Sequence, residues 1–267
     1  MPTIESQGLD GGSSGGEKAA MRILILGGTG EAAELARALG RYPSLDATLS
    51  LAGRTAEPKP QALPVRIGGF GGAEGLAAHL RAECIDRLID ATHPFAARIS
   101  RNAASAAEAA GVRLLAIRRT PWAQEPGDAW TEVGSVAEAA GALGAVPRTV
   151  FVTVGRNEVA AFAAAPQHRY LVRTIEPVDG ALPVPNLVEI RARGPYDAAA
   201  EEDLMARHGV EVLVSKNAGG AATHGKIAAA RRLGLPVVMV RRPEKPAVEA
   251  VADAAGALRW LGIAASG

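Results

Sequence analysis

The sequence predicts an α/β fold of two lobes, each built on a parallel sheet, with a cleft between them. Short apolar runs alternate with alanine-rich stretches of helical length, as in strands joined by crossover helices. A glycine-rich turn directly follows the first apolar run. The alternation breaks over residues 118–133, where prolines, glycine and tryptophans show no clear period, and then resumes. This break predicts the boundary between the lobes.

The first lobe is expected over residues 21–120. Residues 1–20 are rich in glycine and serine and are expected to form a flexible tail ahead of it. The alternation predicts, in order, strand 22–26, helix 31–39, strands 47–51 and 65–67, helix 72–82, a strand ending at residue 90, helix 96–110 and strand 112–117.

The second lobe is expected over residues 121–267 and to contribute contacts to the substrate. Its predicted elements are, in order, helix 135–143, strands 149–154, 170–173 and 187–190, helix 196–208, strand 212–214, helix 223–233, strand 237–240 and a closing helix over 247–261.

Composition excludes several classes of function. The chain has 29 basic and 28 acidic residues, a formal net charge of +1, which argues against broad nucleic-acid binding. No apolar run reaches the length of a membrane span, so no membrane segment is expected. The histidines and the single cysteine, Cys84, form no metal-binding pattern, so no metal site is expected. A lone cysteine fits the reducing cytoplasm, and we expect Cys84 to be buried beside the apolar run that follows it.

The glycine-rich turn has the spacing of a dinucleotide-binding loop. Gly28, Gly30 and Ala33 match the pattern G-x-G-x-x-G/A between a strand and a helix, as in Rossmann-like folds. Gly28 permits a tight turn, Gly30 lets the backbone approach a pyrophosphate, and Ala33 allows close packing of the helix on the strand. The amides of the first helical turn then face the anion. The alternative is a tight turn that binds no ligand.

The end of the second predicted strand favours NADP(H) over NAD(H). An NAD-preferring fold commonly places an acid there, which accepts a hydrogen bond from the ribose 2′-hydroxyl. Here Gly53, Arg54 and Thr55 follow the strand, with no acid among them. Arg54 suits a 2′-phosphate, and Thr55 adds a hydroxyl. The alternative for Arg54 is a solvated surface side chain.

Three other strand ends are polar, and ligands of doubly wound sheets bind at this edge. They are residues 90–95, 154–157 and 214–220. Because the first lies in the first lobe and the others in the second, we expect facing polar loops across a cleft. Each loop has a structural alternative: Thr92 and His93 as helix caps, Asn217 within a sharp turn, and Lys216 in solvent.

Four segments together resemble one family. The residues MRILILGGTGE at 21–31, AGRT at 52–55, DATHPFA at 90–96 and SKNAGG at 215–220 resemble the precorrin-6A reductase family of cobalamin biosynthesis. The resemblance extends over about residues 21–261. It implies that NADPH reduces precorrin-6A, or its cobalt form, to the 6B product. A hydride is added to one carbon of the macrocycle and a proton to the neighbouring carbon.

The resemblance also implies roles for individual residues. The substrate carries many carboxylates, which gives the basic residues of the second lobe a purpose. We expect the cofactor to contact Gly28, Thr29, Gly30, Glu31, Gly53, Arg54, Thr55 and Thr92. We expect the substrate to contact Arg156, Arg173, Ser215, Lys216 and Asn217. His93 and Lys216 are the candidate catalytic residues.

The proton donor stays open at this stage. His93 suits a general acid by its ordinary pKa, Lys216 would need a lowered pKa, and solvent is a third source. Two alternative functions also stay open. One is an NADP(H)-binding sensor without turnover, and the other is a reductase of another polyanionic small molecule.

Overall fold

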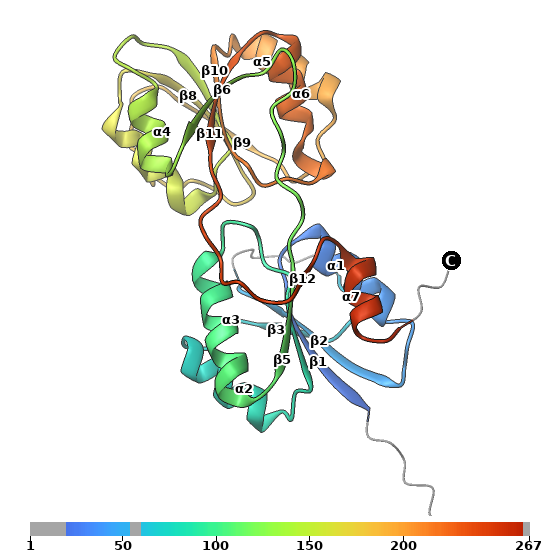
Figure 1. Cartoon of the computed structure of the whole chain (residues 1–267). Coiled ribbons are helices and arrows are strands. Elements are labelled where there is room, and N and C mark those ends of the chain that lie inside the picture. Colours follow the sequence, from blue (N-terminus) through green and yellow to red (C-terminus); the bar gives the residue numbers. More distant parts are fainter. Residues whose placement is uncertain (1–19, 54–59, 264–267) are drawn as a thin grey trace, which may run out of the picture.

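The computed structural model describes residues 20–53 and 60–263. The chain forms two lobes joined by two connections, as Figure 1 shows. The outgoing connection covers residues 118–128 and the return connection covers residues 241–249. Residues 1–19 of the expected tail, and the expected cofactor contacts Arg54 and Thr55, lie outside the described residues.

The first lobe contains a parallel sheet of six strands. These are β1 (Met21–Leu26), β2 (Leu45–Leu51), β3 (Val65–Ile67), β4 (Arg87–Asp90), β5 (Arg113–Ile117) and β12 (Ala250–Val251). Their order is β12-β5-β4-β1-β2-β3. Helices α1 (Gly30–Leu39) and α7 (Ala254–Trp260) cover one face, and α2 (Ala73–Ala82) and α3 (Ala97–Ala110) cover the other (Figure 1).

The second lobe contains another parallel sheet of six strands. These are β6 (Ala129–Val133), β7 (Thr149–Val152), β8 (Arg169–Thr174), β9 (Leu187–Arg191), β10 (Val212–Lys216) and β11 (Pro236–Val240). Their order is β6-β11-β10-β7-β8-β9. Helix α4 (Val136–Ala142) and the 3₁₀ helix η1 (Arg156–Ala164) cover one face. Helices α5 (Ala198–His208) and α6 (Gly225–Arg232) cover the other, and a short 3₁₀ turn, η2 (Ala221–Thr223), precedes α6.

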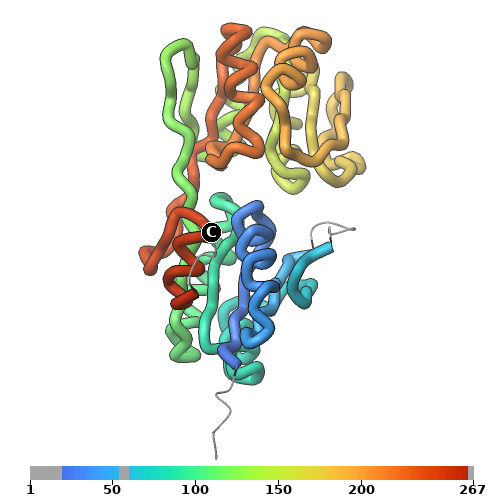
Figure 2. Tube along the Cα trace, turned by 90° about the vertical axis from the view of Figure 1, so that its right-hand side faces the viewer, coloured from blue at the N-terminus to red at the C-terminus, as the bar shows by residue number. Residues whose placement is uncertain are grey.

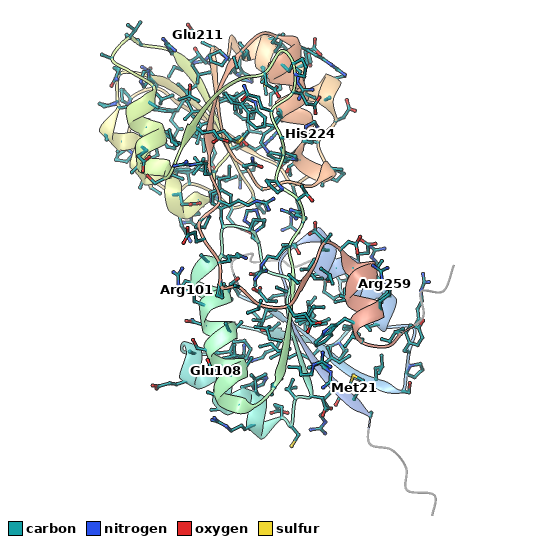
Figure 3. The ribbon with its side chains drawn as sticks, in the orientation of Figure 1. Met21, Arg101, Glu108, Glu211, His224 and Arg259 are labelled. Atoms are coloured by element: carbon teal, nitrogen blue, oxygen red, sulfur yellow. The ribbon has the colours of Figure 1, made fainter. Side chains whose placement is uncertain are left out.

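The two lobes exchange their outermost strands. After β5 the chain crosses to the second lobe as β6, which pairs with β11. After β11 it crosses back as β12, which pairs with β5. Figure 2 shows both crossings, and Figure 3 labels Arg259 of α7 in the lobe of Met21, away from Glu211 and His224. The expected second lobe of residues 121–267 therefore needs a correction, because residues 250–260 belong to the sheet and core of the first.

The central strands are buried on both faces, so they consist of continuous apolar runs rather than alternating ones. In β1, Ile23 and Ile25 pack against α1 and α7, whereas Leu24 and Leu26 pack against α2 and α3. Each such buried side chain stabilises the fold by about 1.5–3 kcal/mol relative to exposure. The predicted two-lobed α/β fold with parallel sheets is confirmed.

Three local predictions were wrong. Strand β6 lies in the stretch expected to be irregular, because its side chains are mostly exposed and leave no apolar run. The closing helix begins at Ala254, capped by Asp253, because residues 250–251 form β12 instead. Cys84 is exposed rather than buried, since it lies in the turn after α2 with a φ of 48°.

Among the described residues, no helix is both long enough and apolar enough to cross a membrane.

Candidate active site

The glycine turn after β1 leaves room beside its backbone. Gly28 has a φ of 110°, a conformation that favours glycine. A Cβ built at Gly28 or at Gly30 would meet no atom within 4 Å. Thr29 caps α1 by accepting a hydrogen bond from Ala32 N at 3.2 Å, and its hydroxyl donates to Ala91 O at 2.8 Å. The turn is thus fixed to the loop after β4, with open space where a pyrophosphate would approach α1.

Close packing of α1 on the sheet depends on different small residues from the one predicted. Ala33 was expected to allow this packing, but it is only half-buried. Ala32 is the buried residue of this turn. A Cβ at Gly27 would lie 2.6 Å from Leu49 Cδ1 and 3.5 Å from Ala32 Cβ. Gly27 and Ala32 therefore let the helix and β2 come together.

A pocket opens beside the glycine turn, at the carboxyl ends of β1, β2 and β4. Gly53 lies in its wall with a φ of 70°, and Thr92 and His93 close its other side. The pocket is lined by Gly27, Gly28, Leu51, Ala52, Gly53, Ile67, Thr92, His93, Ala96 and Ile99. Its position fits a dinucleotide, because nucleotides bind at the carboxyl edge of such sheets and Gly27 and Gly28 add no side chain to its lining.

The first-lobe loop, residues 90–96, is organised around a buried carboxylate. Asp90 Oδ1 accepts hydrogen bonds from Thr92 N at 3.1 Å and from Thr92 Oγ1 at 2.6 Å. Asp90 Oδ2 accepts from Arg118 Nη2 at 2.6 Å. Burial raises the pKa of Asp90, but Arg118 and the hydroxyls of Ser100 and Thr92 more than offset it and hold the pKa below its usual value. Asp90 is therefore ionised and shapes the loop.

His93 is neutral in this environment. Its Nδ1 accepts a hydrogen bond from Phe95 N at 3.2 Å, which places the ring proton on Nε2. Burial lowers the pKa of His93 to about 3, with a further contribution from nearby cations. These cations are Arg119, Lys216, Lys245 and Arg242. The premise that His93 keeps an ordinary pKa, which suited it to general acid catalysis, is wrong.

Lys216 reaches from the second lobe towards the first-lobe loop. Its Nζ lies 4.8 Å from the centroid of the Phe95 ring and forms an ion pair with Glu158. The structure therefore brings the two candidate catalytic side chains, Lys216 and His93, to the same junction.

Arg156 lies at the start of η1, and its exposed ion pair with Asp179 leaves it accessible to a ligand.

Arg173 does not face the cleft, contrary to the expected substrate contact. It is buried, and its guanidinium forms two hydrogen bonds with the buried carboxylate of Glu201. The guanidinium carbon also lies 3.6 Å from the centroid of the Tyr196 ring. Both terminal nitrogens of the guanidinium are therefore bonded inside the second lobe. Its position near the end of a strand suggested a ligand contact, because the sequence gives no sign of its partner Glu201 in α5.

Ser215 and Asn217 also have internal partners rather than a free surface. Ser215 is fully buried. Asn217 Oδ1 accepts a hydrogen bond from Trp122 N at 2.8 Å, and its Nδ2 donates to Trp122 O at 2.9 Å. Both ends of the Asn217 amide therefore hold the outgoing connection. The expected substrate contacts at Ser215 and Asn217 are contradicted by these positions.

The second-lobe loop, residues 215–220, is hydrogen-bonded to both connections. Arg119 Nε donates to Ala218 O at 2.7 Å, while Arg242 Nη1 donates to Arg119 O at 2.6 Å. Arg242 also donates to the carbonyl oxygens of Asn217 and Ala218. At Gly219 a Cβ would lie 2.2 Å from Thr120 O, so only glycine fits there. The distinctive SKNAGG segment thus fixes the crossing between the lobes.

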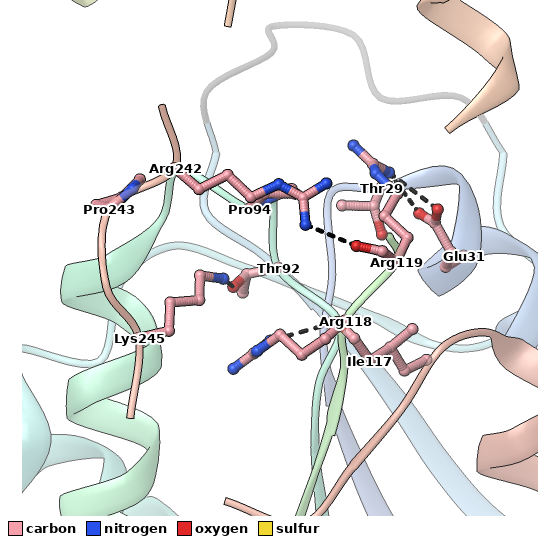
Figure 4. A pocket seen from close by; sticks show the side chains of 10 residues that line it. All are labelled: Thr29, Glu31, Thr92, Pro94, Ile117, Arg118, Arg119, Arg242, Pro243 and Lys245. Carbon is pink, nitrogen blue, oxygen red and sulfur yellow. Dashed lines mark hydrogen bonds and ion pairs between the residues drawn. The ribbon is translucent and has the colours of Figure 1, made fainter. Parts of the chain in front are cut away.

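A second pocket lies between the connections and the first lobe (Figure 4). Its lining residues are Thr29, Glu31, Thr92, Pro94, Ile117, Arg118, Arg119, Arg242, Pro243 and Lys245. Thr92 lines both pockets, so they adjoin. Cations outnumber carboxylates in this lining, which suits an anionic ligand.

Glu31, expected at the cofactor, is engaged within this second pocket. Its two carboxylate oxygens accept hydrogen bonds from Arg119 Nη1 at 3.0 and 2.7 Å. Burial raises the pKa of Glu31, but the hydrogen bonds and charge of Arg119 outweigh it and leave the pKa below its usual value. Glu31 therefore stays ionised and ties the glycine turn to the outgoing connection.

Lys245 is the pocket residue that the sequence did not point to. Its Nζ donates to His93 O at 2.9 Å and to Thr92 Oγ1 at 3.4 Å. It belongs to no motif and lies far from either loop in the sequence. The sequence feature that could have pointed to Lys245 is the pair of prolines on either side of it, Pro243 and Pro246. Two prolines so close together predict an extended segment rather than a helix.

Comparison with known proteins places the chain in one family. The family model described as "Precorrin-6x reductase CbiJ/CobK" matches residues 22–262. The chain belongs to this family. The resemblance found in the four sequence segments is thereby confirmed. Over 226 residues the chain is 55% identical to a precorrin-6A reductase from Sinorhizobium sp, covering 85% of this chain and 86% of that relative.

Other members of the precorrin-6x reductase family agree. A precorrin-6A reductase from Rhodococcus erythropolis is 50% identical over 242 residues, covering 90% of this chain and 97% of the relative. A solved structure titled "CobK precorrin-6A reductase" has a TM-score of 0.87 at 45% identity, covering 91% of this chain and 96% of that one. Two relatives named cobalt-precorrin-6A reductase are 26% and 29% identical.

Proposed function

We propose that this chain is an NADPH-dependent precorrin-6A reductase of cobalamin biosynthesis, which transfers a hydride to the macrocycle to give precorrin-6B. The observation that carries the proposal is the match to relatives named precorrin-6A reductase over most of both chains, at up to 55% identity. The open glycine turn beside a pocket at the sheet edge supports it, because a reductase of this kind needs a nicotinamide cofactor.

The first lobe would hold the cofactor. The amides at the start of α1 are placed to bind the pyrophosphate, and Gly53 and Thr92 line the adjoining pocket. A bound dihydronicotinamide would supply the hydride. Preference for NADPH is proposed from Arg54 and Thr55, which follow β2 where an NAD-binding fold commonly has an acid.

The protein's own residues would bind charge and exclude water. Arg118, Arg119, Arg242 and Lys245 surround the pocket between the connections and the first lobe, and they suit the carboxylates of a tetrapyrrole. Lys216, at the edge of the second lobe, would add a further cation opposite His93. We propose the metal-free substrate, because the relatives named for the cobalt form are the more distant ones.

A spectroscopic assay tests this proposal. Purified protein is mixed with NADPH and precorrin-6A, and the nicotinamide absorbance is followed, with NADH and cobalt-precorrin-6A as parallel substrates. We expect oxidation of NADPH, faster than that of NADH, with the metal-free substrate preferred. Saturable NADPH binding without oxidation would instead indicate a sensor. Oxidation only by another polyanion would contradict the substrate assignment.

An Arg54 variant tests the cofactor preference separately. Arg54→Gln removes the charge proposed to meet the 2′-phosphate. We expect its dissociation constant for NADPH to rise by about tenfold, while that for NADH stays unchanged. Equal losses for both cofactors would contradict a role at the 2′-phosphate.

A further inference from the structure

Lys245 joins the return connection to the first-lobe loop. Its Nζ donates to His93 O at 2.9 Å and lies 3.4 Å from Thr92 Oγ1, and Thr92 lines both adjoining pockets. Figure 4 shows the side chain extending from the return connection to Thr92. Both of its oxygen partners are uncharged groups. Lys245 therefore presents an ammonium at the boundary between the two pockets.

Charged groups from three parts of the chain act on Lys245. Asp90 ends β4, Arg118 and Arg119 belong to the outgoing connection, and Arg242 belongs to the return connection. Partial burial lowers the pKa of Lys245 to about 8. Asp90 works in the opposite direction, and the three arginines add to the lowering. Glu31 and neutral His93 complete the surroundings. At neutral pH the Lys245 side chain is protonated, and its ammonium is a stronger acid than that of an ordinary lysine.

The other titratable groups at the pocket are unsuited to giving up a proton. Glu31 and Asp90 have lowered pKa values and are ionised, so they hold none. His93 is neutral, because its pKa lies near 3. Arginine side chains do not deprotonate in proteins. Lys216 lies outside this lining, in its ion pair with Glu158. Among the described cations that line the pocket, the pKa is lowered at Arg242 and at Lys245, and of these two only the lysine can give up its proton.

We propose that Lys245 is the group that supplies the proton needed to complete the reduction. This inference rests on the proposed function. The double bond of the substrate gains a hydride at one carbon, from the reduced nicotinamide, and its electron pair takes a proton from Lys245 Nζ at the neighbouring carbon. Lys245 is left as a neutral amine, and the nicotinamide that would supply the hydride would be left oxidised. Water then returns one proton to Nζ, so each turnover uses one NADPH and one proton.

Two substitutions separate proton donation from charge. Lys245→Met removes both the charge and the proton, whereas Lys245→Arg keeps the charge on a group that does not act as an acid. We expect turnover of both variants to fall by about 100-fold or more, the usual contribution of a positioned general acid. Arg241→Met is the matched control, because Arg241 is an exposed neighbour on the same connection and is absent from the pocket lining. It should keep wild-type turnover.

The pH profile gives a second measure. Because the acid form is active, kcat/KM of the wild-type enzyme should fall as the pH rises through about 8, and this limb should disappear in Lys245→Arg. Independently of activity, NMR of ¹³Cε-labelled lysine should show a resonance that titrates near pH 8 and is lost in both variants, beside that of the buried Lys226 near pH 7, which is kept. Binding of NADPH should stay within about twofold in all three variants.

The outcomes keep the two proposals apart. If wild-type protein fails to oxidise NADPH with precorrin-6A, the proposed function is wrong. If wild-type protein is active and Lys245→Arg turns over at the wild-type rate, Lys245 acts only as a charge and the proton assignment is wrong. Unchanged turnover in Lys245→Met, or a lysine resonance that titrates near its ordinary value of about 10.4, would also overturn it.

Discussion

The two lobes have the same strand order, but they use the loops that follow the equivalent strands β4 and β10 differently. In the first lobe, residues 90–96 border two pockets, and the glycine turn beside them has open space at Gly28 and Gly30. In the second lobe, the corresponding residues 215–220 are in contact with the two connections. A Cβ at Gly219 would overlap Thr120 O of the outgoing connection. The loop at this edge of the sheet borders open space in the first lobe, whereas in the second lobe it mainly holds the two connections.

This difference shows that a polar loop at a strand end is not by itself a ligand site. Asp90 and Asn217 are both buried, and each is satisfied by a neighbouring segment. The loop that Asp90 shapes borders two pockets, whereas both ends of the Asn217 amide are bound to Trp122 of the outgoing connection. We infer that the exchange of outer strands required a rigid crossing, and that the second-lobe loop provides it.

Replacing Arg173 should give the largest effect on stability and none on substrate binding. Arg173→Met leaves the buried carboxylate of Glu201 without its partner, which is expected to cost about 3–5 kcal/mol of unfolding free energy. Chemical denaturation measures this loss, and KM for precorrin-6A should stay within about twofold of wild type. Arg156→Met is the control, because its exposed ion pair with Asp179 should be worth less than about 1 kcal/mol. A raised KM without a loss of unfolding free energy would instead show that Arg173 contacts the substrate.

Alanine at two glycines should separate the roles of the lobes. Gly219→Ala meets the backbone of Thr120 and requires a φ of 66°, so we expect a loss of about 2–3 kcal/mol of unfolding free energy. Gly30→Ala meets no atom within 4 Å and should change stability by less than about 0.5 kcal/mol. Gly30→Ala should nevertheless weaken NADPH binding by about tenfold, measured by calorimetry, because its methyl group enters the space proposed for the phosphates. Loss of stability in Gly30→Ala would contradict this division.

Near neutral pH, the smallest expected effect is the dependence of stability on pH that comes from His93. Its pKa of about 3 in the folded state lies below the value of about 6.5 expected when unfolded, so the unfolded state binds more protons below pH 6.5. Stability therefore falls as the pH is lowered from about 6.5 towards 3, with a slope of at most about 1.4 kcal/mol per pH unit. His93→Asn should reduce this slope. In NMR, the ring resonance of His93 should not titrate between pH 8 and 5, and a midpoint near 6.5 would contradict the buried neutral ring.

The parts of the fold that were predictable depend on local sequence. Strand β1, the glycine turn and α1 follow from an apolar run, a G-x-G spacing and a capping threonine within twenty residues. The contacts that redefine the site join distant segments instead. Arg173 and Glu201 lie 28 residues apart, Asn217 and Trp122 lie 95 apart, and Lys245 and Thr92 lie 153 apart. No periodicity or motif encodes such pairs, since the first depends on the packing of α5 on the second sheet and the other two depend on the connections between the lobes.

Hydrogen exchange with and without saturating NADPH tests the central claim most directly, which is that only the first of two similar lobes binds the cofactor. We predict slower amide exchange at residues 27–33 and 90–96, and unchanged exchange at residues 155–158 and 215–220. Protection that appears first at residues 215–220, or that is equal in both lobes, would contradict the account.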